Sequence, residues 1–494
     1  MSAKTSLTHP LQIAEVQSAP GHGLIGISFC PGKVQNSAFS GRWERSLDID
    51  LDAIAAWGAA AVVSLIEDHE LASLQVQAMG SAVRDRHMAW FHLPIVDVST
   101  PDDHWETQWL TAGPALRQMI RSGFNVFVHC KGGLGRAGTI AARLMVELGQ
   151  DRDSAIEAVR IARAREAIET RQQEAHVRKQ VPLATCAPDV SSQAIKDRAV
   201  GALLGLAVGD AVGTTLEFKR RDTYRRLTDM VGGGPFHLKA GDWTDDTAMA
   251  MALSASLEQC GRLDETDLMD RFIDWYRNGN YSCTGTCFDI GNTTSSALRR
   301  YEKTGNPIAG SSDPSDAGNG SLMRLSPVAV RFWHDREALR DAAARQSRTT
   351  HASTACVEAC TLYADMIADA IEGKSLDQIL APRAEIYGSL IGPIAQGSWR
   401  GRHRSTIEAS GYVVHALEAS IWCVARSHDF ESAVLMAANL GQDADTTAAI
   451  TGQLAGALYG ASAIPAHWRE RVAWSARITA MAERLTASAM AELK

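Results

Sequence analysis

A cysteine and an arginine six residues apart, Cys130 and Arg136, stand in a segment whose composition suits the transfer of a phosphoryl group. Residues 125–139 read NVFVHCKGGLGRAGT, so an apolar run leads into the cysteine and a glycine-rich turn follows it. Backbone N–H groups of such a turn converge on a phosphate, and the N-terminus of the following helix attracts the same anion. This positive field favours an ionised thiol, so Cys130 is a candidate nucleophile, and Arg136 can hold two phosphate oxygens. A plainer explanation is a buried free cysteine that precedes a turn.

The pattern resembles the protein tyrosine and dual-specificity phosphatase superfamily over residues 20–180. The segments most similar to the subgroup of cyclin-dependent-kinase-associated phosphatase are CPGK at 30–33, VVSLIEDHEL at 62–71 and AIETRQQE at 167–174. The resemblance implies a cysteine phosphatase in which an aspartate on a loop protonates the leaving oxygen. Asp97, in the segment HLPIVDVSTPDD, is the best match for that acid, and Asp102 and Asp103 are its competitors.

The residue after the arginine departs from the family pattern. Ala137 stands where this superfamily usually has serine or threonine, whose hydroxyl assists breakdown of the phosphocysteine. The resemblance therefore implies slow turnover, unless Thr139 or a water takes over that task. Two hypotheses stay open: the domain is an active phosphatase, or it binds a phosphorylated ligand or a partner and targets the rest of the chain.

Oxygen-bearing side chains are grouped in four segments of the C-terminal half, each expected in a loop beside a helix. The segments read GDAVGTTLEF at 209–218, GDWTDDTAMAM at 241–251, CFDIGNTT at 287–294 and GQDADTTAAI at 441–450. Mg²⁺ and Mn²⁺ prefer about six oxygen ligands, which carboxylates, hydroxyls and waters supply. A single Asp or Thr before a helix is usually a cap. Two clusters that each join acids to a threonine ahead of an Ala-rich helix exceed what a cap requires, and they indicate a metal site.

Residues 195–490 resemble the ADP-ribosylglycohydrolase family, and in particular its dinitrogenase-reductase-activating members. The similar segments are DRAVGALLGLAVGDAVG, GGGPFHLKAGDWTDDTAMA, CFDIGNTT, GNGSLMRLSPVAV and GYVVHALEASIW. The resemblance implies an all-α fold that binds two divalent cations, Mg²⁺ or Mn²⁺. The ligands that it implies are Thr244, Asp245, Asp246, Asp443, Asp445 and Thr446. Glu217 is implied to be a nearby acid, either a ligand or a catalytic group.

The same resemblance implies a reaction and a substrate. The family removes ADP-ribose from modified side chains, and the CFDIG segment is similar to arginine-directed members, which places Asp289 at the scissile ribose. Two cations can orient ribose hydroxyls and make a water more acidic, while carboxylates move protons. The residues implied to hold the diphosphate, ribose and adenine are Gly233, Gly234, Gly318, Asn319, Gly320, Ser321, Met323, His351 and Tyr412. Each also has a structural explanation, as a turn glycine, a core residue or the start of a helix.

The elements that must position these groups change character near residue 185. Before it, β-branched runs alternate with helical stretches, which predicts an α/β domain with a mostly parallel sheet. The expected strands are 24–28, 62–66, 90–95 and 125–129, and the expected helices are 51–58, 71–86, 104–121 and a helical part over 138–176. After it, long Ala- and Gly-rich helical windows follow one another, which predicts an all-α domain.

We therefore expect a multidomain chain. Its parts are an N-terminal α/β cysteine-phosphatase-like domain at 1–182, a linker at 183–194 and a C-terminal all-α ADP-ribosylglycohydrolase-like domain at 195–494. Its expected partner is an ADP-ribosylated protein substrate. An alternative is an immunity-type protein, which binds an ADP-ribosylating toxin as well as reversing its modification.

Composition limits the classes of partner and compartment. A formal net charge of −8 over 494 residues, with no long run of like charge, argues against a nucleic-acid or anionic-membrane binder, which needs a basic face. The nine cysteines are odd in number and lack the spacing of a disulfide scaffold. The first residues lack an apolar signal region, and the longest apolar stretches are too short or too interrupted to span a bilayer. These features predict a cytoplasmic protein with reduced thiols.

Overall fold

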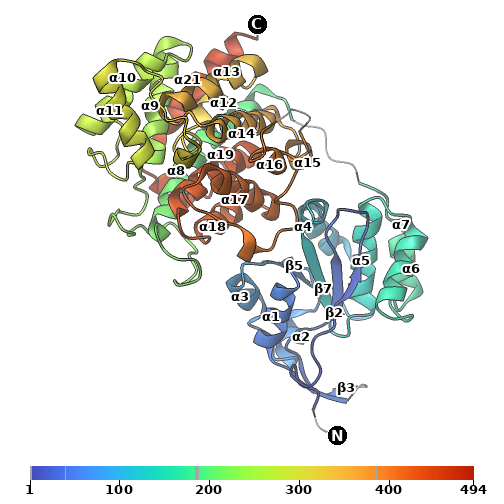
Figure 1. Ribbon diagram of the computed structural model, residues 1–494. Helices are drawn as coiled ribbons and strands as arrows, with labels where there is room; N and C mark the ends of the chain where they lie inside the picture. The colour runs from blue at the N-terminus through green and yellow to red at the C-terminus, as the bar shows by residue number, and fades with distance from the viewer. Residues whose placement is uncertain (1–2, 39–40, 184–188, 384–386, 494) are drawn as a thin grey trace. The chain divides into compact units, whose positions relative to one another are not determined.

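The computed structural model describes residues 3–38, 41–183, 189–383 and 387–493. The chain forms two compact units, Met1–Thr185 with Arg400–His403, and Cys186–Trp399 with Arg404–Lys494. Part of the expected linker at 183–194 lies outside the described residues, at 184–188, and the first helix of the second unit already begins at Ser192. Each unit has its own buried core, and Figure 1 traces the elements of both.

Five strands form the main sheet of the N-terminal unit, in the order β1-β2-β7-β5-β6. Their bounds are β1 Ala14–Val16, β2 Ile25–Phe29, β5 Ala59–Ser64, β6 Ala89–His92 and β7 Asn125–Cys130. Strand β1 runs antiparallel to β2, and the other pairings are parallel. A second, two-stranded sheet pairs β3, Val34–Ala38, with β4, Gly41–Glu44. The expected parallel sheet is present, whereas β1, β3 and β4 were not expected from the sequence.

Seven helices accompany these strands in the described part of the N-terminal unit. They are α1 Leu47–Ala56, α2 Asp68–Ser73, α3 Met79–Asp85, α4 Asp103–Arg121, α5 Gly135–Glu147, α6 Arg152–Ala162 and α7 Arg171–Lys179. The single helix expected at 71–86 is wrong: it is two helices, because Gln75 between them has a φ of 60°, which a right-handed helix cannot accommodate. Helices α4 and α5 pack against β7, so the residues that follow β7 are held by a layered α/β core.

The C-terminal unit is helical throughout its described part, as the sequence predicted, with isolated bridges in place of strands. The longer helices are α8 Ser192–Gly213, α9 Asp245–Cys260, α10 Glu265–Asn278, α11 Asn292–Thr304, α13 Arg336–Thr350, α14 Thr354–Glu372, α17 Val413–Arg426, α19 Ala444–Tyr459 and α21 Ser475–Ala491. The shorter ones are α12 Ser326–Phe332, α15 Leu376–Ile379, α16 Gly392–Ala395, α18 Phe430–Ala438 and α20 Ala466–Arg471. Short 3₁₀ turns lie at Thr214–Leu216, Pro314–Asp316, Arg404–Thr406 and Ala461–Ala463.

Helices α8 and α19 form the centre of this unit and approach each other at backbone distance. Glycines recur at every fourth position of α8, at 201, 205, 209 and 213, and each faces a backbone carbonyl of α19. A Cβ built on Gly209 would lie 2.1 Å from the carbonyl oxygen of Ala448, so the pair tolerates no side chain there. This spacing repeats along one helix face, because residues four apart lie above one another.

One segment in the described part of the chain, Ser192–Leu216, is long and apolar enough to cross a membrane, with a mean hydropathy of 1.6 over its most apolar window. In the structure 94% of that window is buried inside the unit. The apolar character of α8 is therefore accounted for by its place at the centre of the helical core.

Candidate functional site

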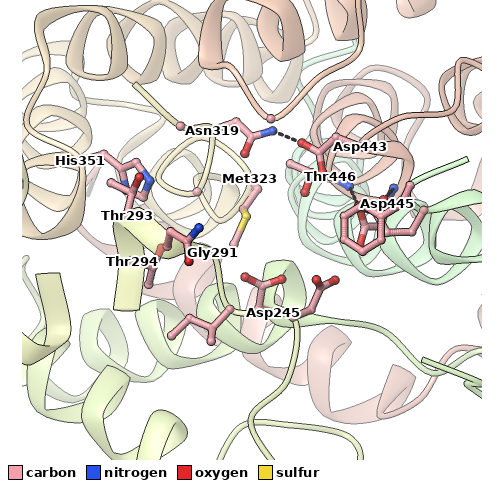
Figure 2. A pocket seen from close by; sticks show the side chains of 18 residues that line it. Asp245, Gly291, Thr293, Thr294, Asn319, Met323, His351, Asp443, Asp445 and Thr446 are labelled. Atoms are coloured by element: carbon pink, nitrogen blue, oxygen red, sulfur yellow. Dashed lines mark hydrogen bonds between the residues drawn. The ribbon is translucent and has the colours of Figure 1, made fainter. Parts of the chain in front are cut away.

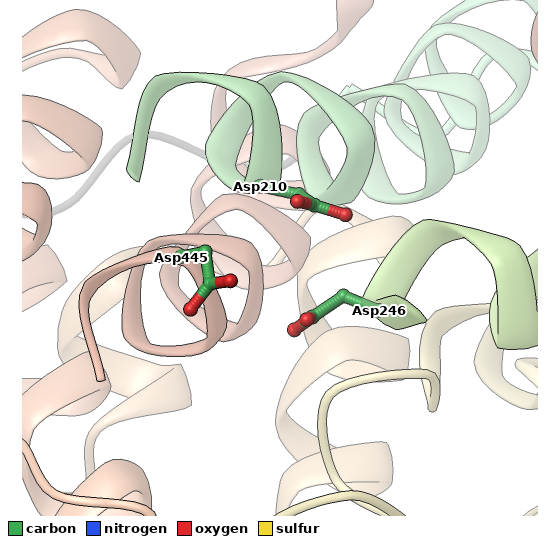
Figure 3. A group of neighbouring side chains, drawn as sticks. All are labelled: Asp210, Asp246 and Asp445. Carbon is green, nitrogen blue, oxygen red and sulfur yellow. The ribbon is translucent and has the colours of Figure 1, made fainter. Parts of the chain in front are cut away.

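Three carboxylates from different parts of the sequence meet where α8, α9 and α19 come together. Asp210 lies in α8, Asp246 in the first turn of α9 and Asp445 in the first turn of α19. One oxygen of each lies within 4.8 Å of one oxygen of each of the other two, and all three residues are buried. Figure 3 shows the three side chains directed toward a common space. A buried group of carboxylates that face one another is suited to a divalent cation.

Two threonine hydroxyls join this group. The Thr244 hydroxyl lies 2.9 Å from an oxygen of Asp210, 3.2 Å from one of Asp246 and 3.4 Å from one of Asp445. The Thr446 hydroxyl lies 3.4 Å from the same Asp246 oxygen. A hydroxyl has only one proton to donate, so it can satisfy one of these carboxylates at a time. The cluster therefore holds more carboxylate oxygens than the two hydroxyl protons can satisfy. Ligands around a cation show the same excess of oxygen atoms.

Asp210 has a second task that explains how α9 is positioned. Its carboxylate accepts hydrogen bonds from the backbone N–H of Thr244 at 2.9 Å and from that of Thr247 at 3.0 Å, and from the Thr247 hydroxyl at 2.6 Å. It thus takes the place of an N-cap, since the Thr244 side chain makes no capping bond of its own. Asp210 was not among the ligands that the resemblance implied, although it lies in the oxygen-bearing segment GDAVGTTLEF; the available signal was an aspartate in the apolar last turns of α8.

A second acidic group adjoins the first and shares Asp445 with it. Oxygens of Glu217, Asp443 and Asp445 lie within 4.8 Å of one another. The Glu217 carboxylate accepts hydrogen bonds from the N–H groups of Ala444, at 2.8 Å, and Asp445, at 3.3 Å, so it sits at the positive end of α19. The Asn319 amide donates to Asp443 at 2.6 Å (Figure 2). Two adjacent groups that share one carboxylate match the arrangement expected for a dinuclear centre.

Burial and mutual repulsion act on all these acids. Loss of water, and then the charges of neighbouring carboxylates, raise the pKa of each of six side chains: Asp210, Glu217, Asp245, Asp246, Asp289 and Asp443. The pKa is about 7 for Asp210 and Asp443 and about 11 for Asp289. One oxygen of Asp246 is buried without a hydrogen-bond partner among the described residues. A set of buried acids with an unpaired oxygen fits divalent cations, which would supply the missing positive charge.

A cavity of about 540 Å³ opens directly over the acidic groups. That volume is in the range of small-molecule and cofactor sites. Eleven residues that the sequence singled out line it: Glu217, Asp245, Asp289, Gly318, Asn319, Gly320, Met323, His351, Asp443, Asp445 and Thr446. Figure 2 shows Asp443, Asp445 and Thr446 on one side of the cavity and Thr293, Thr294 and His351 on the other. The structure therefore brings together segments that are more than two hundred residues apart.

His351 is a neutral ring in the wall of this cavity. Burial lowers its pKa to about 3, and its Nδ1 lies 2.8 Å from the Thr350 hydroxyl. A Cβ built on Gly318 or Gly320 would lie 3.3 or 3.1 Å from the other ring nitrogen, Nε2. The two glycines thus leave space beside Nε2, which explains why this loop has no side chains there.

Six of the residues expected in the site lie outside the cavity lining. Thr244 and Asp246 are buried beneath it in the acidic cluster. Gly233 pairs with Leu238 in an isolated bridge, and Gly234 passes so close to the Thr214 carbonyl that no Cβ fits. The buried Ser321 hydroxyl bonds with that of Ser347 at 2.9 Å, and Tyr412 packs edge-on against His415. These contacts give Gly233, Gly234, Ser321 and Tyr412 structural roles. That these four residues bind ADP-ribose stays a prediction.

The structure adds cavity residues that the sequence did not single out, namely Phe218, Ile290, Gly291, Asn292, Thr293, Thr294 and Gly411. Five of them continue the CFDIGNTT segment into α11, which was already marked by Asp289. Sequence proximity to Asp289 was therefore the usable signal for these five. Phe218 ends the segment GDAVGTTLEF and Gly411 begins the segment GYVVHALEASIW, but neither residue was itself assigned to the site.

In the N-terminal unit, Cys130 ends β7 and the glycine-rich turn leads into α5, as expected. The buried Cys130 Sγ accepts a hydrogen bond from the Gly133 N–H at 3.2 Å, and Gly133 has a φ of 73°. Arg163 donates to the carbonyls of Gly132, at 3.2 Å, and Gly133, at 2.9 Å, from outside the turn. Arg163 thus occupies two carbonyls of the turn, while the Gly133 N–H faces the thiol, as in a loop whose N–H groups receive a phosphate.

Arg136 is buried and held by two acids. Its guanidinium makes hydrogen bonds to both oxygens of Glu70, at 2.6 and 3.0 Å, and donates to the Ile95 carbonyl at 2.9 Å. An Asp97 oxygen lies 2.9 Å from the same guanidinium. Asp102 instead caps α4 by accepting from the Trp105 N–H at 2.8 Å, so that competitor has a structural role. Of the proposed acids, Asp97 is the one that the structure places against Arg136.

Two further residues bear on turnover at this site. Glu169 accepts a hydrogen bond from the backbone of Gly135 at the start of α5, and burial followed by the charge of Asp97 raises the pKa of Glu169. The Thr139 hydroxyl donates to the Gly135 carbonyl at 2.8 Å and is buried. Thr139 is thus already bonded within α5, while Glu169, like Glu70, is an acid beside the loop that the sequence-based site did not include.

Comparisons with known proteins agree with this geometry. The ADP-ribosylglycohydrolase family model matches residues 191–493, and a model for the Swiss Army Knife protein, DSP-PTPase phosphatase domain, matches residues 37–187. ADP-ribosylarginine hydrolase Tri1 of Pseudomonas putida (strain GB-1) is 46% identical over 289 residues, which are 58% of this chain and 78% of that protein. ADP-ribosyl-[dinitrogen reductase] glycohydrolase of Rhodospirillum rubrum is 34% identical over 289 residues, 57% of this chain and 92% of that protein.

A solved structure described as an ADP-ribosylglycohydrolase-related protein complex is also similar. It is 38% identical, with a TM-score of 0.54, and the match covers 60% of this chain and 100% of that one. The family model covers more than half of the chain, and the acidic groups lie inside the matched region. The chain therefore belongs to the ADP-ribosylglycohydrolase family, with a phosphatase domain of the DSP-PTPase kind fused ahead of the glycohydrolase domain.

Proposed function

We propose that the C-terminal unit hydrolyses the N-glycosidic bond between ADP-ribose and an arginine side chain of a protein, with two Mg²⁺ or Mn²⁺ ions. The observation that carries the proposal is the pair of acidic groups that share Asp445 on the floor of the cavity. Two relatives named ADP-ribosylarginine hydrolase, 46% and 42% identical, support arginine as the linked residue.

The donor set suits hard cations. The residues that would hold the ions are Asp210, Glu217, Thr244, Asp245, Asp246, Asp443, Asp445 and Thr446. All are oxygen donors, which Mg²⁺ and Mn²⁺ prefer over nitrogen or sulfur. When bound, such ions offset the negative charge of the acids, orient ribose hydroxyls and make a water more acidic.

The protein's own residues fix the directions of the reacting groups. Asn319 holds the Asp443 carboxylate, and the first N–H groups of α19 hold that of Glu217, so neither needs to reorganise when substrate arrives. Asp289 lines the same cavity beside Asp445, where its carboxyl can accept N–H groups of the substrate guanidinium. The neutral His351 ring offers Nε2 to a ribose hydroxyl in the space left by the neighbouring glycines.

The decisive experiment compares linkages with and without a chelator. Purified protein is incubated with arginine-linked and serine-linked ADP-ribosyl peptides, and release of ADP-ribose is measured with Mg²⁺, with Mn²⁺ and with EDTA. We expect faster release from arginine and loss of activity in EDTA. Full activity in EDTA would contradict the metal assignment, and equal or faster release from serine would contradict the arginine assignment.

We propose that the N-terminal unit is a cysteine-dependent phosphatase, because Cys130 and Arg136 flank one glycine-rich loop, with the Gly133 N–H facing the thiol and Asp97 beside the guanidinium. The competing proposal, a phosphate-binding module, is favoured by Ala137. Hydrolysis of an aryl phosphate by the full chain in EDTA, compared with Cys130→Ser, separates the two. The thiolate is the nucleophile, so Cys130→Ser should abolish hydrolysis but retain binding of phosphate. If wild type and Cys130→Ser hydrolyse the aryl phosphate at the same background rate, the phosphatase proposal fails and the phosphate-binding module replaces it.

The compartment is also a proposal. The eight cysteines in the described part of the chain are free, which suits the reducing cytoplasm. An ADP-ribosylated protein is the proposed partner there. A pull-down of a catalytically inactive variant with an ADP-ribosyltransferase would test the alternative in which the chain also binds the modifying toxin.

A further inference from the structure

An exposed aromatic ring stands at the edge of the acidic cavity. Phe218 lines the cavity directly after Glu217, and 68% of its surface is exposed. Every other phenylalanine or tryptophan in the described part of the chain is buried or half-buried. Single exposed apolar side chains are common elsewhere on the chain, so what distinguishes Phe218 is its place in the lining of a polar cavity, where its ring is available to a ligand.

The backbone holds Phe218 in an unfavourable conformation. Its φ is 59°, in the left-handed region that bulky residues rarely adopt. The Phe218 N–H donates to the Gln442 carbonyl at 2.7 Å, and the Gln442 N–H donates to the Lys219 carbonyl at 2.7 Å. This reciprocal pair ties the ring to the segment that leads into Asp443 and Asp445. Backbone strain that the surrounding structure enforces is most common at functional sites.

Two further rings extend from Phe218. Phe236 meets Phe218 edge-on at 6.4 Å between ring centroids, and Phe288 lies 5.4 Å from Phe236. Phe288 immediately precedes Asp289 in the sequence, as Glu217 immediately precedes Phe218. We call these three rings the aromatic rim. It runs from one cavity carboxylate to another.

We propose that the aromatic rim binds the arginine side of the substrate, with Phe218 packed against the guanidinium and the aliphatic stem of the modified arginine. This inference rests on the proposed arginine-directed hydrolase. A ring face attracts a cation and packs against an aliphatic stem, and the modified arginine offers both. The diphosphate of ADP-ribose is anionic, and the negative face of a ring does not attract an anion. Charge therefore assigns the rim to the cationic leaving group.

The assignment separates two measurable quantities. Truncation of Phe218 should lower kcat/KM for the ADP-ribosylarginine peptide. The affinity for the product ADP-ribose, which lacks the arginine, should stay unchanged. For Phe218→Ala we expect kcat/KM on an ADP-ribosylarginine peptide to fall about tenfold, the scale of one cation–aromatic contact, with inhibition by ADP-ribose unaltered. Phe218→Trp should retain most of the wild-type kcat/KM.

Two variants guard against a trivial explanation. Phe218→Gly relieves the left-handed strain, so a loss caused by the backbone would recover, whereas a loss caused by the missing ring would persist. Ile308→Ala removes another exposed side chain of the same unit, 42% exposed and outside the lining, and should match wild type. Denaturant midpoints of all variants identify any that fail to fold.

The outcomes are distinct. An unchanged peptide kcat/KM in Phe218→Ala would overturn the inference, and so would an equal loss of ADP-ribose inhibition, because the ring would then contact the nucleotide. If wild type itself releases no ADP-ribose from arginine, the proposed function fails before the rim is tested. A peptide-specific loss in both Phe218→Ala and Phe218→Gly supports the assignment.

Discussion

Replacing Gly209 with alanine should push apart the two helices that carry the acidic cluster. The added Cβ would lie 2.1 Å from the Ala448 carbonyl oxygen, and neither atom can rotate away from its backbone. Asp210 follows Gly209 on α8, and Asp445 lies one turn before Ala448 on α19. The substitution therefore acts at the contact that brings these two carboxylates together.

The size of the effect follows from that distance. Close carbon–oxygen contacts in proteins settle at about 3.3 Å, so the helices must separate by roughly 1 Å. Overpacking of this kind costs about 1–3 kcal/mol of unfolding free energy. A displacement of about 1 Å at a catalytic centre can slow a reaction by roughly a hundredfold. We expect Gly209→Ala to lose about 2 kcal/mol and at least tenfold in the rate of ADP-ribose release.

Denaturant unfolding followed by tryptophan fluorescence measures the first effect, and ADP-ribose release from an arginine-linked substrate measures the second. Gly388→Ala is the matched control, because its Cβ would meet only the flexible Glu358 carboxylate, at 3.2 Å. If Gly209→Ala unfolds and reacts like Gly388→Ala, the close packing of α8 and α19 is refuted. If Gly209→Ala loses stability but releases ADP-ribose at the wild-type rate, the acidic site does not depend on the contact between α8 and α19.

Four other outcomes are expected. Asp445→Asn, which alters the carboxylate shared by both acidic groups, should lower the kcat of ADP-ribose release about a hundredfold or more, and an unchanged kcat would contradict the shared site. Arg136→Ala should remove most aryl phosphatase activity, since the clamp on the transferring group is lost; retention of that activity would exclude the role. Asp97→Ala should slow hydrolysis of alkyl phosphates more than of activated aryl phosphates, and equal slowing of both would exclude Asp97 as the acid. Ala137→Ser should speed steady-state turnover and shrink any initial burst, if breakdown of the phosphocysteine is limiting.

Local sequence was sufficient for the phosphate loop. Strand β7, the glycine turn and α5 are contiguous, so the order of residue types around Cys130 and Arg136 already contained the geometry. The acids that hold Arg136 were harder to place. Glu70 comes from the short helix α2 that follows β5, and the parallel pairing of β5 with β7 brings it to the arginine.

The acidic centre was predicted in part for the same reason. Thr244 and Asp246, like Asp445 and Thr446, form short motifs at the starts of α9 and α19, where oxygen-bearing side chains are easily recognised. Asp210 lies in the last turn of α8 and resembles an ordinary buried polar residue until α8 is packed against its neighbours. The glycines at 233 and 234 show the converse: the sequence suggested a ligand loop, and the structure explains them by bridge pairing and close backbone approach.

The sequence by itself determined the two-domain fusion, the class of each domain and the short motifs that carry the chemistry, because these depend on neighbouring residues and on helix or strand periodicity. Tertiary structure alone decided which motifs meet. Asp210 and Asp445 are 235 residues apart, and they share one site because glycines on α8 let its backbone touch α19. Phe218 is held at the cavity edge by hydrogen bonds to Gln442, in the segment before Asp443. Such long-range contacts depend on packing between whole helices, which no local pattern of residues encodes.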